Sequence, residues 1–356
     1  MKIDRRTAAT NPTRVAFVLI PRFNMMTVTM AIEPMRIANY LAPEALYAWE
    51  YVSHDGGEIV ASNGMGIRSQ PLGGMANPAD IVFVCGSWGC EHYNEPALFN
   101  RLRRLEREGT TLVSLEIGVY PLARAGLLSE RKATTHWSCI AGFSEQFPRI
   151  DVREQLFTVD GNLITCGGGT ASLDLTLYLI ARHHGDQLAS EVADQVLHHP
   201  VRAGEAPQRH TMGALTKEIH PDVKAAISLI ETNVGEPPTV PKIAAGLGIS
   251  QRRLERLFRR HMGCSIVQFS RLLRLQYARV LLTSTRMSIR EVSAACGFNS
   301  ISYFSHVFSQ CFGKKPSEYR QAWPEAEAAP SWPGTVFSFV EESRLNAKLG
   351  HASGGR

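Results

Sequence analysis

Short apolar runs alternate with amphipathic segments from Arg14 to about His184. RVAFVLI, WEYVSH, ADIVFVCG, TLVSLEIG, KATTHW and FTVDGNLITCGGG predict strands. MTVTMAIEPMRIANYL, EPALFNRLRRLEREG, TASLDLTLYLIARHHG and LASEVADQVLHHP have the apolar spacing of helices. Buried strands separated by helices predict a doubly wound α/β domain, with a mostly parallel sheet covered on both faces.

The C-terminal third has no strand pattern but contains an internal repeat. IAAGLGISQRRLERLFRRHMG aligns with VSAACGFNSISYFSHVFSQCFG when one extra residue, Asn299, is allowed. Each copy predicts a short helix, a turn at Gly248 or Gly297, and a second helix capped by Ser250 or Ser300. The repeat therefore predicts an all-α domain with two helix-turn-helix units, held apart by the long helix SIVQFSRLLRLQYARVLLTST.

One segment rich in small and polar residues separates these two patterns, and a proline-rich segment follows the second. VRAGEAPQRHTMGALT is typical of a linker, and PEAEAAPSWPG follows the helical part. The expected organisation is a flexible tail at 1–13, an α/β domain at 14–200, a linker at 201–216, a helical domain at 217–323 and a mostly flexible tail at 324–356.

The composition narrows the class of protein. A chain of 356 residues favours two domains over one core. VAFVLI is too short to span a bilayer, and no long hydrophobic stretch follows the basic residues at the start, so neither a membrane span nor a secretory signal is expected. Seven cysteines without CxxC pairs indicate reduced thiols in a cytoplasmic protein, with no metal site and no cofactor.

The positive charge is concentrated in the helical part. Between Lys217 and Trp323 there are sixteen Lys and Arg against seven Asp and Glu, a net charge of +9. Because the whole chain carries +5, the remainder carries −4. This asymmetry indicates that the C-terminal part binds nucleic acid.

The second helix of each repeat has an apolar stripe and a polar face. In the first copy Leu254, Leu257 and Phe258 form the stripe, and arginines cover the other faces. Arg252 and Arg256 lie one turn apart, where they can reach a groove edge and bond guanine acceptors. Two such helices enter a duplex on one face when they are about 34 Å apart.

The helical segment resembles the DNA-binding domain of the AraC/XylS family of transcription regulators, from about Pro221 to Arg320. IREVSAACGFNSISYFSHVFSQCFGKKPSEYR matches the family signature nearly throughout, although Ile266 stands where the family usually has a helix-starting proline. The resemblance implies that the protein binds two adjacent major grooves of double-stranded DNA. The predicted contact residues are Ser250, Arg252, Arg253, Glu255, Arg256, Arg260, Ser300, Ser302, Ser305, His306 and Lys314.

In the N-terminal half, TLVSLEIGVYPLARAGLL joins a strand, a turn glycine and a helix from Pro121. In one group of α/β enzymes such a corner presents a nucleophile, and Glu116 occupies it here. Glutamate can act as a general base but is a poor nucleophile for amide or thiol chemistry. GSWGC lacks the spacing of a GxSxG elbow, and CGGGTAS lacks the lysine of a phosphate-binding loop.

This half resembles the PfpI-like branch of the class I glutamine amidotransferase superfamily, from about Arg14 to Gly185. The matching segments are AIEPMRIAN, DIVFVCG, LEIGVYPLARAGLLSERKATTHW and GGGTASLDLTLYLIARHHG. The family's enzymes have a cysteine at the position of Glu116, so the resemblance implies that the covalent chemistry is lost and that there is no catalytic residue. The alternative is a relocated nucleophile, with Cys85 as the candidate, in an active hydrolase or hydratase fused to a DNA-binding domain.

Together the two resemblances describe GlxA-type regulators, in which the enzyme-like domain senses a small metabolite. Relatives of this architecture respond to arginine, carnitine or glycine betaine, and SWPGTVFSFVEESR looks most like the betaine-responsive members. Buried carboxylates favour a cationic ligand group, and aromatic faces suit a quaternary ammonium. The predicted effector-binding residues are Glu33, Trp88, Tyr93, Glu116, His136 and Trp137.

Two of these assignments have plainer explanations, since Glu33 can pair with Arg36 and Trp137 can belong to the core. By analogy with its fold relatives, the sensor domain is expected to form a homodimer that places the DNA-binding domains on neighbouring half-sites. Effector binding then favours contact with RNA polymerase and activates transcription. A ligand-independent architectural DNA-binding protein is the remaining alternative.

Overall fold

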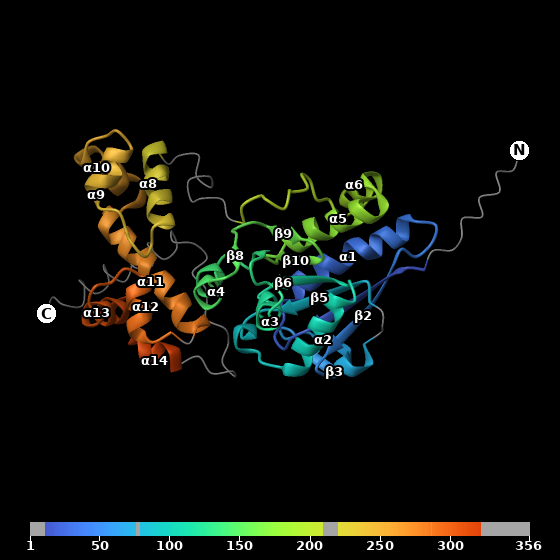
Figure 1. Ribbon diagram of the computed structural model, residues 1–356. Helices are drawn as coiled ribbons and strands as arrows, with labels where there is room; N and C mark the ends of the chain where they lie inside the picture. Colours follow the sequence, from blue (N-terminus) through green and yellow to red (C-terminus); the bar gives the residue numbers. More distant parts are fainter. Residues whose placement is uncertain (1–10, 76–78, 209–219, 286, 322–356) are drawn as a thin grey trace, which may run out of the picture. The chain divides into compact units, whose positions relative to one another are not determined.

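An eight-stranded sheet with the strand order β3-β4-β2-β1-β5-β6-β10-β9 forms the centre of the N-terminal unit (Figure 1). This computed structural model describes residues 11–75, 79–208, 220–285 and 287–321. The strands are β1 (Thr13–Leu19), β2 (Tyr47–Ser53), β3 (Asp55–Val60), β4 (Gly66–Pro71), β5 (Ile81–Gly86), β6 (Thr111–Glu116), β9 (Phe157–Asp160) and β10 (Leu163–Cys166). Only the β3–β4 and β9–β10 pairs are antiparallel. The mostly parallel sheet predicted from the sequence is confirmed.

Helices cover both faces of this sheet because side chains of the central strands alternate between two cores. In β1, Val15, Phe17 and Leu19 join one core, whereas Ala16 and Val18 join the other. The first core is closed by α1 (Met25–Leu41), α5 (Ala171–His184) and α6 (Asp186–Gln195), and the second by α2 (Pro96–Arg107), α3 (Val119–Arg124) and α4 (Ile140–Gln146). The doubly wound fold follows from this alternation.

Some small elements were not predicted. The β3–β4 hairpin lies at the sheet edge, where its glycine-rich and largely exposed sequence lacks a clear apolar alternation. KATTHW was predicted as a strand, but only Lys132–Ala133 (β7) is extended, and it pairs with β8 (Asp151–Val152) outside the main sheet. Two 3₁₀ turns, η1 (Leu72–Gly74) and η2 (Cys90–His92), complete the described part of the unit.

The first unit extends to Gln208, so the predicted domain end at residue 200 needs correction. Residues 201–208 pack against the sheet domain: Arg202 pairs with Asp174 of α5, and Leu156 donates a backbone hydrogen bond to Ala206. The composition of this stretch resembles a linker, but several of its polar groups form hydrogen bonds to the domain. The rest of the predicted linker and both predicted tails lie mostly outside the described residues.

Seven helices make up the described part of the second unit, in which no strand occurs. They are α8 (Pro221–Thr232), α9 (Val240–Gly246), α10 (Gln251–Met262), α11 (Ile266–Ser284), α12 (Ile289–Ala295), α13 (Ile301–Phe312) and α14 (Pro316–Gln321). The predicted turn glycines have left-handed backbones, with φ of 66° at Gly248 and 69° at Gly297. Within the described part of the chain, no helix is long and apolar enough to cross a membrane.

Both predicted serine caps are confirmed. The hydroxyl oxygens of Ser250 and Ser300 accept hydrogen bonds from the third residue of α10 and of α13, each at 3.3 Å. Ser265 caps α11 in the same way and places Ile266 at its first position, where the side chain is buried. The absent proline therefore changes nothing in the start of this helix.

Candidate effector cavity and nucleic-acid interface

Glu116 ends β6 in a left-handed backbone conformation, with φ of 59°. Such a φ is unfavourable for a residue with a side chain, by about 1–2 kcal/mol, and is maintained here by close packing. A Cβ on Gly118 would lie 2.1 Å from the carbonyl oxygen of Val84, so only glycine lets the chain turn this tightly toward α3. The corner thus places Glu116 at the end of β6, where it lines a cavity.

The Glu116 carboxylate is buried and held by two hydroxyl groups. Thr27, in the first turn of α1, donates to Oε2 at 3.3 Å, and Ser87, just after β5, donates to Oε1 at 3.2 Å. The backbone N–H of Gly169 donates to the Thr27 hydroxyl at 2.9 Å and so fixes its orientation. No ion pair of Glu116 is found among the residues that the structure describes.

Burial dominates the electrostatics of Glu116. Loss of water raises the pKa of its carboxyl to about 7, against the opposing effect of hydrogen bonds from Ser87, Asn24 and Thr27. Near neutral pH the side chain is therefore divided between a neutral acid and a carboxylate without a cationic partner. A cation entering beside it would favour the ionised form.

A cavity of about 200 Å³ opens beside Glu116. Its walls come from the start of α1, the end of β6, the loop before α5 and the chain after α6. The lining residues are Asn24, Glu116, His136, Trp137, Leu156, Gly167, Gly168, Gly169, Thr170, Ala171, Arg202 and Gln208. The structure therefore brings together three of the six predicted effector residues, Glu116, His136 and Trp137. The rings of His136 and Trp137 pack with their centroids 5.3 Å apart.

In the second unit, α10 buries Leu254 and Phe258 and exposes its arginines. In α13 the buried side chains are Phe304, Val307 and Phe308. Of the predicted DNA contacts, Glu255 and Ser305 are half-buried; the exposed ones are Ser250, Arg252, Arg253, Arg256, Arg260, Ser300, Ser302, His306 and Lys314. Arg253 also lies 3.6 Å from the Asp222 carboxylate of α8.

Two exposed apolar residues of α13 were not predicted as part of this interface. Ile301 and Tyr303 have 40% and 49% of their surface accessible, beside Ser302 in the first turn. Apolar contact with thymine methyl groups is one way of reading the major groove. Their exposure could not be read from the sequence, which marks them only as apolar.

Two known domain families match the chain: the DJ-1/PfpI family over residues 13–182 and a helix-turn-helix domain family over residues 243–322. The HTH-type transcriptional regulator CdhR of Pseudomonas aeruginosa is 39% identical over 89% of this chain and 94% of its own. The regulator GbdR of the same species is 35% identical over 88% and 86% of the two chains, and GlxA of Rhizobium meliloti is 35% identical over 87% and 96%. The chain belongs to the GlxA-type transcription regulators.

In this GlxA-type regulator the DJ-1/PfpI domain precedes an AraC-type helix-turn-helix domain, as the sequence predicts. These relatives are transcription regulators, not enzymes. The thiol chemistry agrees, because burial raises the pKa of Cys85 far above its ordinary value and that of Cys166 to about 12. A nucleophilic cysteine must be a thiolate, so Cys85 is unsuited to the role of relocated nucleophile.

Three predicted effector residues of the GlxA-type sensor domain lie elsewhere. Glu33 is exposed and pairs with Arg36 at 2.7 Å. It lies six residues after Thr27, which places it about 9 Å further along α1 and on another side of the helix. The prediction that Glu33 lies beside Glu116 is wrong because the strand end is followed first by Asn24 and Thr27.

The two aromatic residues after β5 are also outside the cavity. Trp88 is partly buried and packs against the second core. Tyr93 lines a separate hollow of about 280 Å³ with His54 and Glu95, and its backbone oxygen accepts a hydrogen bond from Arg124. Tyr93 lies beyond the turn η2, seven residues after the end of β5, so its closeness in sequence to a strand did not place it at Glu116.

Sequence reasoning missed several residues at Glu116 or its cavity, among them Thr27, Ser87, Arg202 and Gln208. Ser87 directly follows a predicted strand, and Thr27 lies in the first turn of the helix after β1. Ligands of doubly wound sheets bind at the carboxyl ends of the strands, so this rule could have found both residues. Arg202 and Gln208 carry no such signal, because they lie in a stretch with the composition of a linker.

Proposed function

We propose that this GlxA-type regulator senses a small cationic or zwitterionic metabolite in the Glu116 cavity and activates transcription when the metabolite is bound. The observation that carries the proposal is the buried Glu116 carboxylate, which has no described ion-pair partner and lies beside an open cavity. An unpaired buried charge is unfavourable, and a ligand cation compensates it.

The chemistry of the cavity wall supports a small, positively charged group. Trp137 contributes an aromatic side chain, and an aromatic face attracts a quaternary ammonium through its quadrupole. A volume of about 200 Å³ suits a compact metabolite. Glycine betaine, carnitine and arginine, to which the resemblance points, all carry such a cation.

In each protomer, α10 enters one major groove of the operator DNA and α13 enters the adjacent one. The protein forms a homodimer that occupies neighbouring half-sites and contacts RNA polymerase when the effector is bound. Such a response requires the effector to prefer one arrangement of the protein over another, since a ligand shifts an equilibrium only by its differential affinity. The exposed arginines of α10 support the groove contact.

Arg256→Ala is expected to weaken binding to the operator by about 1–3 kcal/mol and to relax base preference at one position, since Arg bonds guanine O6 and N7. The measurement is a titration of the full-length protein with operator duplexes carrying each base at each position. An equal loss on every sequence would make Arg256 a phosphate contact. Arg290→Ala is the matched control, because it removes an exposed arginine that lies outside α10 and α13.

The proposed sensing is tested by the melting temperature of the full-length protein with glycine betaine, dimethylglycine, carnitine, choline or arginine. A ligand present at 100 times its dissociation constant adds about 2.7 kcal/mol of stability, a shift that is easily measured. Glu116→Gln should abolish the shift and Glu33→Gln should keep it. Melting unchanged by every compound would favour the architectural alternative, and turnover that is lost in Cys85→Ala would favour the enzyme.

A further inference from the structure

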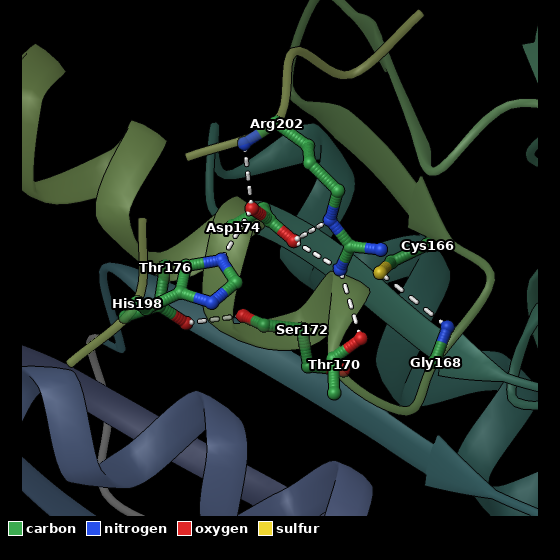
Figure 2. A network of polar contacts seen from close by, with 8 residues as sticks. All are labelled: Cys166, Gly168, Thr170, Ser172, Asp174, Thr176, His198 and Arg202. Carbon is green, nitrogen blue, oxygen red and sulfur yellow. Dashed lines mark hydrogen bonds and ion pairs between the residues drawn. The ribbon is translucent and has the colours of Figure 1, made fainter. Parts of the chain in front are cut away.

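The chain after α6 folds back onto the sensor domain and contributes Arg202 and Gln208 to the wall of the Glu116 cavity. We call residues 198–208 the return segment. Figure 2 shows its first anchor: the Asp174 carboxylate of α5 lies between His198 and Arg202. The segment is also the last described part of the first unit, and the sequence continues from it toward the DNA-binding unit.

Arg202 is held in a defined orientation. Its backbone N–H donates to Asp174 Oδ1 at 2.8 Å, and its Nε donates to Oδ2 at 3.0 Å. Its Nη2 donates to the hydroxyl of Thr170 at 2.8 Å as well as to Asp174. The Asp174 side chain is fully buried, whereas that of Arg202 keeps 36% of its surface accessible. The bonds to Asp174 and Thr170 thus fix the guanidinium group, while part of the side chain stays accessible.

Arg202 lines the same cavity as Glu116. One wall of the cavity therefore carries a carboxylate and another carries a guanidinium. Thr170 and Ala171, at the start of the 14-residue helix α5, also line it, and the partial positive charge of a helix N-terminus has the same sign as Arg202. The two signs of charge on one small cavity match a molecule that carries both.

We propose that Arg202 binds the carboxylate of a zwitterionic effector whose cationic group lies at Glu116. The proposal rests on the proposed sensing function and narrows its ligand class to zwitterions. Arginine has five donors in a planar fork. It can therefore bind a second carboxylate while its bonds to Asp174 and Thr170 persist.

This contact also ties the effector to the return segment. At the far end of the segment, the Gln208 side-chain amide donates to the backbone oxygens of Thr135 and Gln155 at 2.8 and 2.7 Å. Its oxygen accepts a hydrogen bond from the backbone N–H of Trp137 at 2.7 Å. Gln208 is thus part of the cavity wall and packs on Gly167, where a Cβ would lie 2.6 Å from its amide. A ligand held by Arg202 touches the segment that leads to the DNA-binding unit.

The test compares pairs of compounds that differ in the carboxylate: glycine betaine with choline, arginine with agmatine, and carnitine with its methyl ester. Binding to the full-length protein is measured by calorimetry. The wild type is expected to bind one zwitterion about tenfold or more tightly than its partner. Arg202→Lys keeps the charge but loses the fork, so it should weaken that zwitterion about tenfold and leave the partner unchanged. Arg153→Lys, at an exposed arginine outside the cavity, is the matched control.

The outcomes separate this proposal from the sensing function. If a cation binds in a Glu116-dependent way but the wild type does not distinguish the members of any pair, sensing stands and the role of Arg202 is overturned. Equal weakening of both members by Arg202→Lys also overturns it. If no compound binds, both proposals fail. The wild-type comparison needs no variant, so a poorly folded Arg202→Lys protein leaves the proposal testable.

Discussion

Glu116→Gln is expected to remove a pH-dependent loss of stability of about 3 kcal/mol from the sensor domain. The folded state raises the pKa of this carboxyl from 4.5 to about 7 because burial disfavours the charge. Each pKa unit corresponds to about 1.4 kcal/mol. The neutral side chain stabilises the fold fully below pH 4.5, and this contribution is lost as the pH rises through 7.

The measurement is urea unfolding of full-length wild type and variant, followed by tryptophan fluorescence at pH values from 5 to 8. The two proteins should have similar stability at pH 5, and the variant should be the more stable at pH 8. Glu33→Gln is the control, since the exposed Glu33 side chain pairs with Arg36 at the surface. Parallel curves for wild type and Glu116→Gln would show that Glu116 is ionised throughout, and the account of its burial would be wrong.

Effector binding should depend on pH in the opposite sense to the stability of the free protein. Because the ionised carboxylate is the form that pairs with a cation, effector affinity is expected to rise as the pH passes 7. In Glu116→Gln both the rise and most of the affinity should disappear. Ionisation of Glu116 should therefore lower the stability of the free protein and raise its affinity for the effector, so the two measurements test the same side chain.

Phe258→Ala is expected to destabilise the helical unit by about 3–5 kcal/mol. Phe258 is fully buried in α10, and its ring lies 5.3 Å from that of Phe269 in α11, centroid to centroid. Truncation of the side chain leaves a cavity where α10 packs against α11. Since small domains are stable by about 5–15 kcal/mol, the variant should lose much of its folded population near physiological temperature.

Circular dichroism melting and DNA titration measure this effect together. Affinity should fall on every DNA sequence in parallel with the loss of helix, unlike the sequence-dependent loss in Arg256→Ala. Val267→Ala on α11 is the control, because Val267 is 61% exposed and its truncation should change stability by less than about 0.5 kcal/mol. Normal melting of Phe258→Ala would mean that the packing of α10 on α11 contributes little.

The amino-acid sequence alone determined the features that depend on neighbouring residues. The serine caps at Ser250 and Ser300 and the glycine turns at Gly248 and Gly297 lie where the repeat predicts them. Helix caps and turns are satisfied within a few residues, so a local pattern is sufficient to identify them. The parallel sheet followed in the same way from apolar runs separated by helices, whereas the glycine-rich β3–β4 hairpin offered no such run.

Only the tertiary structure decided which side chains surround Glu116. Thr27, Ser87, Arg202 and Gln208 come from four separate segments, and long-range contacts between strand ends and the return segment bring them together. Glu33 was the second acid predicted to bind the effector, but the direction of α1 turns it to the surface. A helix presents each residue in one direction set by its start and its packing, and neither is visible in composition or spacing.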